Sequence, residues 1–344
     1  MSRVLAGAAV IVAMAAVAGC RSEKAANGPA PTKAAAAPNF AFITNGVADF
    51  WEHARAGASK AGEDLGVNVD VITPSSITDQ TRKIEDLLTR GTDGIAISPI
   101  NSANQTEILN QAASQTNLIT QDSDAPDANR LMYIGMDNYD AGLLCGRTLR
   151  KAMPEGGKVA IFVGRVDQDN GRRRRQGFID GLIDRKPDPS RNDPPGDEIK
   201  SEDGKITIVG TLTDNFDRAK AKANVEDTVT RHPDIAGMVG LFGYNPPCIV
   251  EGLDRTSKLG KVKVMGFDED DATLQGVKDG NLVATVVQNP YEYGYQSIKT
   301  LNELHKGNKA VIPANKFVDI PARVIDSANV DPFWREVKER LGKK

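Results

Sequence analysis

The feature that most constrains the fold of this 344-residue chain is a regular alternation of short apolar runs with longer amphipathic stretches, which begins at Asn39. Apolar runs of about four to eight residues are typical of buried strands, and the longer stretches have the periodicity of amphipathic helices. Strands that alternate with helices form parallel sheets covered by helices on both faces. Since one core rarely serves a chain of this length, we predict an α/β protein with two doubly wound parallel-sheet lobes.

The predicted strands span residues 40–44, 67–72, 94–98, 117–120, 131–136, 158–163, 206–212, 237–242, 262–267 and 282–288. The predicted helices span residues 50–65, 79–90, 103–115, 172–183, 218–231, 248–256, 272–279 and 293–305. Residues 185–205 break the alternation. This segment is rich in Pro, Asp and Gly, which indicates a surface insertion.

The N-terminus indicates export. A basic start is followed by an apolar run over 4–17 and by small residues before Cys20. This pattern is typical of a secretory signal, and the run is short of the ~20 residues that span a bilayer. The position of Cys20 resembles a bacterial lipobox, although an ordinary signal peptide with a chance cysteine would look the same. We expect removal of 1–19, lipidation of Cys20, a flexible linker over 20–38, and a membrane-anchored protein in the periplasm or at the cell surface.

Composition excludes several classes of protein. A net charge of −3 argues against a nucleic-acid partner. Cys145 and Cys248 lie far apart in predicted helices, so we expect two buried thiols rather than a disulfide. The acidic group Asp122, Asp124 and Asp127 lacks the glycine and the terminal glutamate of a calcium loop, so we predict no metal site and no cofactor.

Ligands of doubly wound folds bind at the carboxyl ends of the strands, so the residues that follow each strand are the candidate site. Aromatic residues are only 5% of the chain, yet several lie in these loops. Aromatic rings cover the apolar C–H faces of a sugar, and charged or amide side chains pair with its hydroxyl groups. The candidate ligand-binding residues are Phe50, Trp51, Asp122, Arg172, Phe216, Asn245, Phe267, Asp268 and Gln288.

Some of these residues have a purely structural alternative. Phe50 and Trp51 could form a hydrophobic contact at a helix start, and Phe267 could be core packing. Arg172 opens a run of four arginines, which is most often a solvated helix start. We expect Arg172 alone of this run to contact ligand, because it would lie at the helix start beside the cleft, whereas Arg175 shares the helix side of apolar residues.

These segments resemble the ribose-type periplasmic binding proteins of ABC sugar importers, over about residues 39–318. The motifs that match are Ala48-Asp-Phe-Trp51, Gln176-Gly-Phe178, Asn215-Phe-Asp217 and Gly266-Phe-Asp268, with Asp122, Arg172 and Gln288 in the same order. Ala48, Ser98 and Ser123 differ from the residues that are usual in ribose binders. The resemblance therefore implies a monosaccharide-like ligand, a pentose or related sugar, rather than ribose in particular.

The resemblance also implies the connectivity and the partners. We expect residues 39–137 with 289–318 to form an N-terminal lobe, and 138–288 with 319–344 a C-terminal lobe. Three segments that connect the lobes, near Asp137, Gln288 and Val318, would form a hinge. Ligand binding would close the lobes about this hinge. A monomer of this kind would deliver its sugar to an ABC permease in the membrane and would not be an enzyme.

Other functions remain open from the residues alone. Asp122 and Asp268 could act as the acid/base pair of a glycosidase, although Arg172 would lower the pKa of both carboxyl groups rather than raise one. A sensor that presents a sugar or a furanosyl signal to a membrane receptor would have the same sequence features. A transcriptional regulator of this fold would carry a helix-turn-helix where this chain has its signal segment.

Overall fold

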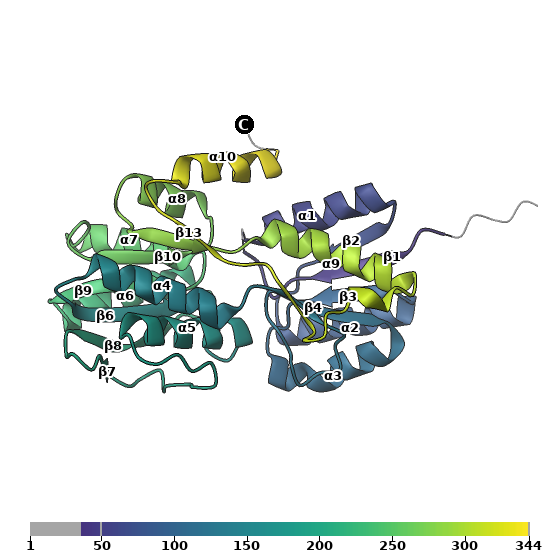
Figure 1. The fold of residues 1–344 in the computed structure, drawn as a ribbon, viewed down its shortest axis with the longest axis horizontal. Coiled ribbons are helices and arrows are strands. Elements are labelled where there is room, and N and C mark those ends of the chain that lie inside the picture. Colours follow the sequence, from purple (N-terminus) through teal and green to yellow (C-terminus); the bar gives the residue numbers. More distant parts are fainter. Residues whose placement is uncertain (1–35, 49, 343–344) are drawn as a thin grey trace, which may run out of the picture. The chain divides into compact units, whose positions relative to one another are not determined.

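The computed structural model describes residues 36–48 and 50–342. The predicted signal segment, Cys20 and most of the linker lie outside the described residues. The described residues from 37 onward form one compact unit. Two sheets with interleaved helices make up this unit, which confirms the predicted α/β class with two doubly wound lobes (Figure 1).

The N-terminal lobe is built on a six-stranded sheet in the order β12-β5-β4-β3-β1-β2. All its strand pairs are parallel. Its strands are β1 (Asn39–Ile43), β2 (Asn68–Ile72), β3 (Gly94–Ile97), β4 (Asn117–Gln121), β5 (Tyr133–Gly135) and β12 (Phe317–Asp319). Its helices are α1 (Phe50–Leu65), α2 (Ile77–Arg90), α3 (Ser102–Gln115) and α9 (Pro290–His305), followed by the 3₁₀ turn η1 (Lys309–Val311).

The C-terminal lobe is built on a seven-stranded sheet in the order β13-β11-β10-β9-β6-β8-β7, with only the outer strands β7 and β13 antiparallel to their neighbours. Its strands are β6 (Gly157–Val163), β7 (Ile199–Lys200), β8 (Ile206–Thr213), β9 (Ile235–Gly240), β10 (Lys263–Phe267), β11 (Ala284–Val287) and β13 (Arg323–Ile325). Its helices are α4 (Asn138–Ala152), α5 (Asp169–Leu182), α6 (Arg218–Arg231), α7 (Asn245–Arg255), α8 (Asp271–Lys278) and α10 (Val330–Arg340).

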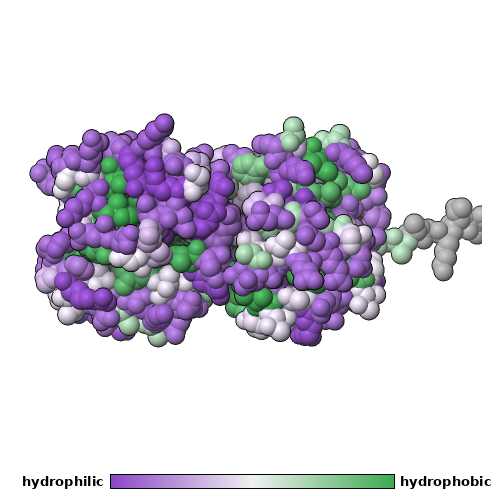
Figure 2. All heavy atoms as spheres, turned by 90° about the horizontal axis from the view of Figure 1, so that it is seen from below, coloured by the Kyte–Doolittle hydropathy of each residue, from purple (hydrophilic) through white to green (hydrophobic). Residues whose placement is uncertain are grey.

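Each sheet is buried on both faces because its strands are apolar at successive positions. In β1, Phe40 and Phe42 pack on the α1 and α9 side, whereas Ala41 and Ile43 pack on the α2 and α3 side. Alternating side chains of a strand point to opposite faces, so a continuous apolar run fills two cores. Figure 2 shows one face of the molecule as mainly hydrophilic, with hydrophobic residues in small separate groups.

The two lobes repeat one topology. The order β2-β1-β3-β4-β5 in the first sheet corresponds to β8-β6-β9-β10-β11 in the second. The chain passes from one sheet to the other after β5, after β11 and after β12. Val318, near which we expected the third crossing, lies inside β12, and the chain leaves that strand only after Asp319.

Several elements differ from the predicted ones. Helix α5 begins at Asp169, three residues before its predicted start. The short strands β7, β12 and β13 and helix α10 were not predicted, and helix α4 was expected only as a helical segment around Cys145, without bounds. Cys145 in α4 and Cys248 in α7 are buried free thiols, as predicted. The predicted insertion 185–205 contains β7, and Arg185 and Arg191 tie it to the buried carboxylate of Asp180 in α5.

Helix α5 packs very closely on α4 because glycines lie at the contact. A Cβ atom on Gly177 would lie 1.9 Å from the backbone oxygen of Tyr139, and a Cβ on Gly142 would lie 2.0 Å from that of Arg174. These contacts leave no room for a side chain, so they fix the position of α5 against the rest of the lobe.

We predict that Gly177→Ala lowers the free energy of unfolding by about 1–3 kcal/mol, because the added methyl group must push α4 and α5 apart. Urea denaturation measures the change. Gly196→Ala is the matched control, since a Cβ there meets nothing within 4 Å. Equal stability of the two variants would contradict the close packing of α4 on α5.

Candidate functional site

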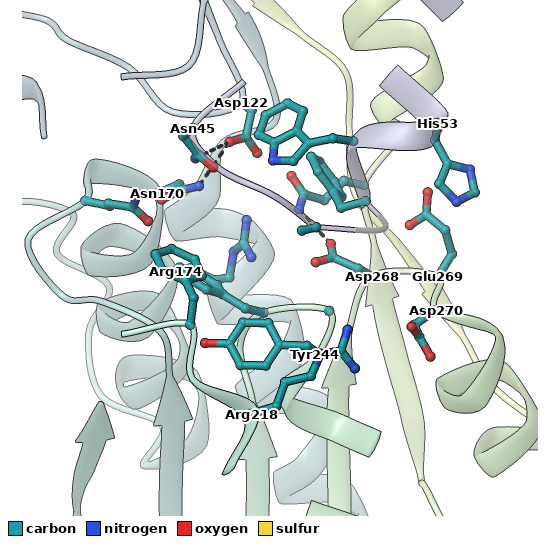
Figure 3. A pocket seen from close by; sticks show the side chains of 18 residues that line it. Asn45, His53, Asp122, Asn170, Arg174, Arg218, Tyr244, Asp268, Glu269 and Asp270 are labelled. Carbon is teal, nitrogen blue, oxygen red and sulfur yellow. Dashed lines mark hydrogen bonds between the residues drawn. The ribbon is translucent and has the colours of Figure 1, made fainter. Parts of the chain in front are cut away.

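A pocket lies where strands of both sheets end, and its lining comes from both lobes (Figure 3). From the N-terminal lobe, it is lined by Asn45, which follows β1, by the start of α1, and by Asp122, which follows β4. From the C-terminal lobe, it is lined by the start of α5 and by the loops that follow β8, β9, β10 and β11. This is the position where doubly wound sheets bind ligands.

Asp122 occupies the end of the fourth strand of the N-terminal sheet. It adopts a left-handed backbone conformation, with φ 59°, and is 3% exposed. Its Oδ2 accepts hydrogen bonds from Ser98 Oγ at 2.9 Å and from the side-chain amides of Asn45 and Asn170, each at 3.3 Å. Burial raises the pKa of Asp122 to about 6, and the nearby charge of Arg174 opposes that shift.

Asp268 occupies the corresponding position at the end of the fourth strand of the C-terminal repeat, β10. It also has a left-handed backbone, with φ 68°, and is 6% exposed. Its Oδ1 accepts a hydrogen bond of 2.6 Å from Gln288 Nε2. Burial raises the pKa of Asp268, and Arg174 again opposes the shift. Such backbone strain at two equivalent positions of a pocket is typical of a functional site.

Arg174 is the cation whose charge acts on both of these acids, and it is 1% exposed. Its Nε and Nη2 donate to Asn138 Oδ1 at 3.2 and 2.9 Å, and its Nη1 donates to the Leu241 carbonyl at 2.7 Å. The guanidinium carbon lies 4.5 Å from the centre of the Phe267 ring. These contacts use three of the five guanidinium N–H groups, which leaves two for a ligand.

Aromatic rings form the apolar part of the pocket. Phe50 and Trp51 meet edge to face at 4.9 Å between ring centres at the start of α1. On the other lobe, Phe216 stacks on Phe242 at 5.8 Å, and Tyr244 lies beside it. Phe216 is 40% exposed and has a φ of 66°, so its ring is held at the pocket by a strained loop.

The structure brings together six of the nine predicted ligand residues. The pocket is lined by Phe50, Trp51, Asp122, Phe216, Asp268 and Gln288. Three predicted residues do not line it, and each has another partner. Phe267 is fully buried beneath Arg174, and Asn245 donates to Asp214 Oδ2 at 2.9 Å.

The prediction for Arg172 needs correction, because the pocket arginine is Arg174. Since α5 begins at Asp169, Arg172 falls in its first turn, where it pairs with Asp169 at 2.8 Å outside the pocket lining. Arg174 lies four residues before Phe178, so both side chains share the buried face of the helix. That spacing was a sequence signal for Arg174.

Other lining residues were missed. Gln168, Asn170 and Tyr244 belong to strand-end loops that the sequence did single out, whereas Asn45 and Glu269 had no distinguishing pattern. Residues 36–48 and 50–342 contain no group of three His, Cys, Asp or Glu side chains that could hold a metal ion. The same residues contain no helix long and apolar enough to cross a membrane.

Comparison with known proteins agrees with this architecture. The family profile described as periplasmic binding protein domain matches residues 40–309, so the chain belongs to that family. Membership makes it a binding protein and not an enzyme, as predicted, and sets the glycosidase alternative aside.

Individual relatives cover most of the chain. The ribose import binding protein RbsB of Salmonella typhimurium is 27% identical over 266 residues, which cover 76% of this chain and 82% of the relative. The D-allose-binding periplasmic protein of Escherichia coli is 25% identical over 309 residues, 86% of this chain and 93% of the relative. A solute-binding protein of Burkholderia graminis, solved in complex with D-arabinose, is 28% identical with a TM-score of 0.78, covering 87% of this chain and 99% of that one.

We predict that Arg174→Met lowers ligand affinity by about 100-fold or more, because it leaves two buried carboxylates without their shared cation. Arg172→Met is the matched control and should change affinity by less than about threefold. Isothermal titration of both variants measures this difference. A larger loss of ligand affinity in Arg172→Met than in Arg174→Met would show that Arg172 is the ligand-binding arginine.

We also predict that Asp122→Asn stabilises the ligand-free protein at neutral pH while it weakens ligand binding. The pKa of Asp122 is raised from 3.8 to about 6 in the folded state. In the window between these two pH values, the folded state therefore binds more protons than the unfolded state does. This group therefore lowers the free energy of unfolding as pH rises through the window. Asp122→Asn should remove that loss, so its free energy of unfolding at pH 7 should exceed that of the unmodified protein by about 1–3 kcal/mol.

Urea denaturation at about pH 4 and about pH 7 tests this prediction. Asp127→Asn, an exposed change in the following loop, is the control and should leave both values unchanged. A lower stability of Asp122→Asn than of the unmodified protein at neutral pH would contradict this prediction. It would show that the hydrogen bonds to the carboxylate outweigh the cost of burying it.

Proposed function

We propose that the protein is an extracytoplasmic lipoprotein that binds a monosaccharide, a pentose or related sugar, between its two lobes and delivers it to an ABC-type permease. The observation that carries this proposal is the pair Asp122 and Asp268, which face one pocket from equivalent strand ends of the two lobes with Arg174 near both. One ligand can therefore bind to both lobes at once.

The chemistry of the lining suits a sugar. Carboxylates accept hydrogen bonds from hydroxyl groups, and the two remaining N–H groups of Arg174 can donate to hydroxyl or ring oxygens. Phe50, Trp51 and Phe216 supply flat apolar surface for the C–H faces of the ring. The names of the relatives, which include ribose and D-allose binders, and a solved neighbour in complex with D-arabinose support the same class of ligand.

Closure about the three connections between the sheets explains how binding is coupled to delivery. Asn170 of the C-terminal lobe donates to Asp122, and Asn101 of the N-terminal lobe donates to Asp167 Oδ2 at 3.1 Å. A ligand held by both lobes adds to these contacts and shifts the population toward the closed form, which a permease can recognise.

The remaining parts of the proposal rest on the sequence. The lipobox-like segment at Cys20 would anchor the protein to the membrane, in the periplasm or at the cell surface, and residues 20–38 would act as a flexible tether. Stable anchoring requires more than one acyl chain. We propose a monomer, since the pocket is lined by residues of one chain.

We predict that one class of sugar raises the melting temperature of the protein and that Asp268→Ala abolishes this effect. A ligand at about 1,000 times its dissociation constant stabilises by roughly 4 kcal/mol. A thermal-shift scan of pentoses, hexoses, polyols and nucleosides measures it. Asp254→Ala, an exposed change in α7, is the control and should keep the shift. A folded protein that responds neither to these compounds nor to their amino-deoxy forms would contradict the proposal.

A further inference from the structure

Two buried polar side chains of the pocket carry atoms that have no hydrogen-bond partner among the residues that the structure describes. Both amide atoms of Gln168 are unsatisfied, and so is Oε2 of Glu269. Gln168 is 1% exposed and Glu269 is 6% exposed, and both line the pocket. Buried polar side chains are nearly always hydrogen-bonded in folded proteins, so each such exception calls for a partner.

Gln168 lies at the N-cap position of α5, but its side chain makes no capping hydrogen bond. The residues around it are all engaged. Asp167 accepts from Arg165 and Asn101, and Asn170 donates to Asp122. The amide of Gln168 is therefore not needed to hold the loop, and it offers one acceptor and two donor hydrogens at the pocket.

Glu269 follows Asp268 directly, so two acids stand side by side in the chain. Burial and the neighbouring charge of Asp268 raise the pKa of Glu269 well above its usual range. The arginines that oppose this shift, Arg323 and Arg340, do not line the pocket and pair with Glu336 at 3.9 and 2.8 Å. Figure 3 places Glu269 on the same side of the pocket as His53 and Asp270.

The described lining of the pocket holds more acids than bases. Its carboxyl groups are those of Asp122, Asp268, Glu269 and Asp270, and its guanidinium groups are those of Arg174 and Arg218. The charge of Arg174 opposes the raised pKa of Asp122 and of Asp268, whereas the two arginines that act on Glu269 lie outside the pocket lining. A group that only donates hydrogen bonds and is positively charged would satisfy Glu269 and offset the excess of acids.

We propose that Gln168 and Glu269 are two further ligand contacts, and that Glu269 makes the pocket select sugars that carry an amino group over their neutral counterparts. This inference rests on the proposed function and narrows its ligand class to amino sugars. Gln168 pairs with a hydroxyl group, for which it can both donate and accept. Glu269 pairs with the ammonium group.

The test is isothermal titration of the purified protein, near neutral pH, with pairs of compounds. Each neutral aldose, among them D-glucose, D-galactose and D-ribose, is compared with its amino-deoxy forms. At least one amino sugar should bind about tenfold or more tightly than its neutral counterpart. Glu269→Gln should abolish that preference, so that the amino sugar and its neutral counterpart bind this variant with similar affinity.

The matched control is Glu107→Gln, an exposed change of the same kind on α3, which should keep the preference. Neutral sugars that bind as tightly as every amino form, with no change in Glu269→Gln, would overturn this inference and leave the proposed function intact. Failure of every neutral and amino sugar to bind would overturn both.

Gln168→Met tests the second contact separately. The variant keeps the length of the side chain and removes its polar atoms, so it should weaken binding of amino and neutral sugars alike by about tenfold. Gln111→Met, exposed on α3, is its control. Unchanged affinity in Gln168→Met would remove Gln168 from the ligand contacts.

Discussion

The buried guanidinium of Arg174 is the interaction on which the site depends. Asp122 and Asp268 are both desolvated, and burial alone would favour their neutral forms. One cation, Arg174, opposes the rise that burial causes in the pKa of both acids. That cation is itself held by Asn138, by the Leu241 carbonyl and by the Phe267 ring. The close glycine contacts of α4 with α5 then determine where this side chain can lie.

The repeat of one topology in two lobes explains why the site has two equivalent acids. Each fourth strand ends in an aspartate with a left-handed backbone, and each aspartate is buried beside an amide donor. Neither lobe alone surrounds a ligand. In the proposed function, this arrangement couples binding to closure, because a ligand would gain its full set of contacts only when it touches both acids.

The alternation of apolar and amphipathic segments was enough to predict the fold class, because strands buried on both faces leave a strong local pattern. The short strands β12 and β13 leave none, since three residues have no periodicity. The strand-end rule found both acids and most of the aromatic rings. It failed at Arg172, where the helix starts earlier than the pattern suggested, and at Phe267 and Asn245, which lie in the right loops but turn toward Arg174 and Asp214. Gln168 lies in a loop that the strand-end rule did find, but that its side chain and Glu269 have unsatisfied polar atoms is seen only in the folded structure.

The measurement that tests this account most directly is a crystal structure of the protein with a bound sugar. The account predicts a ligand whose hydroxyl or amino groups lie within hydrogen-bonding distance of Asp122, Asp268 and Arg174 together, with an aromatic ring against one face. A ligand that contacts only one of the two acids, or that binds away from these strand ends, would contradict it.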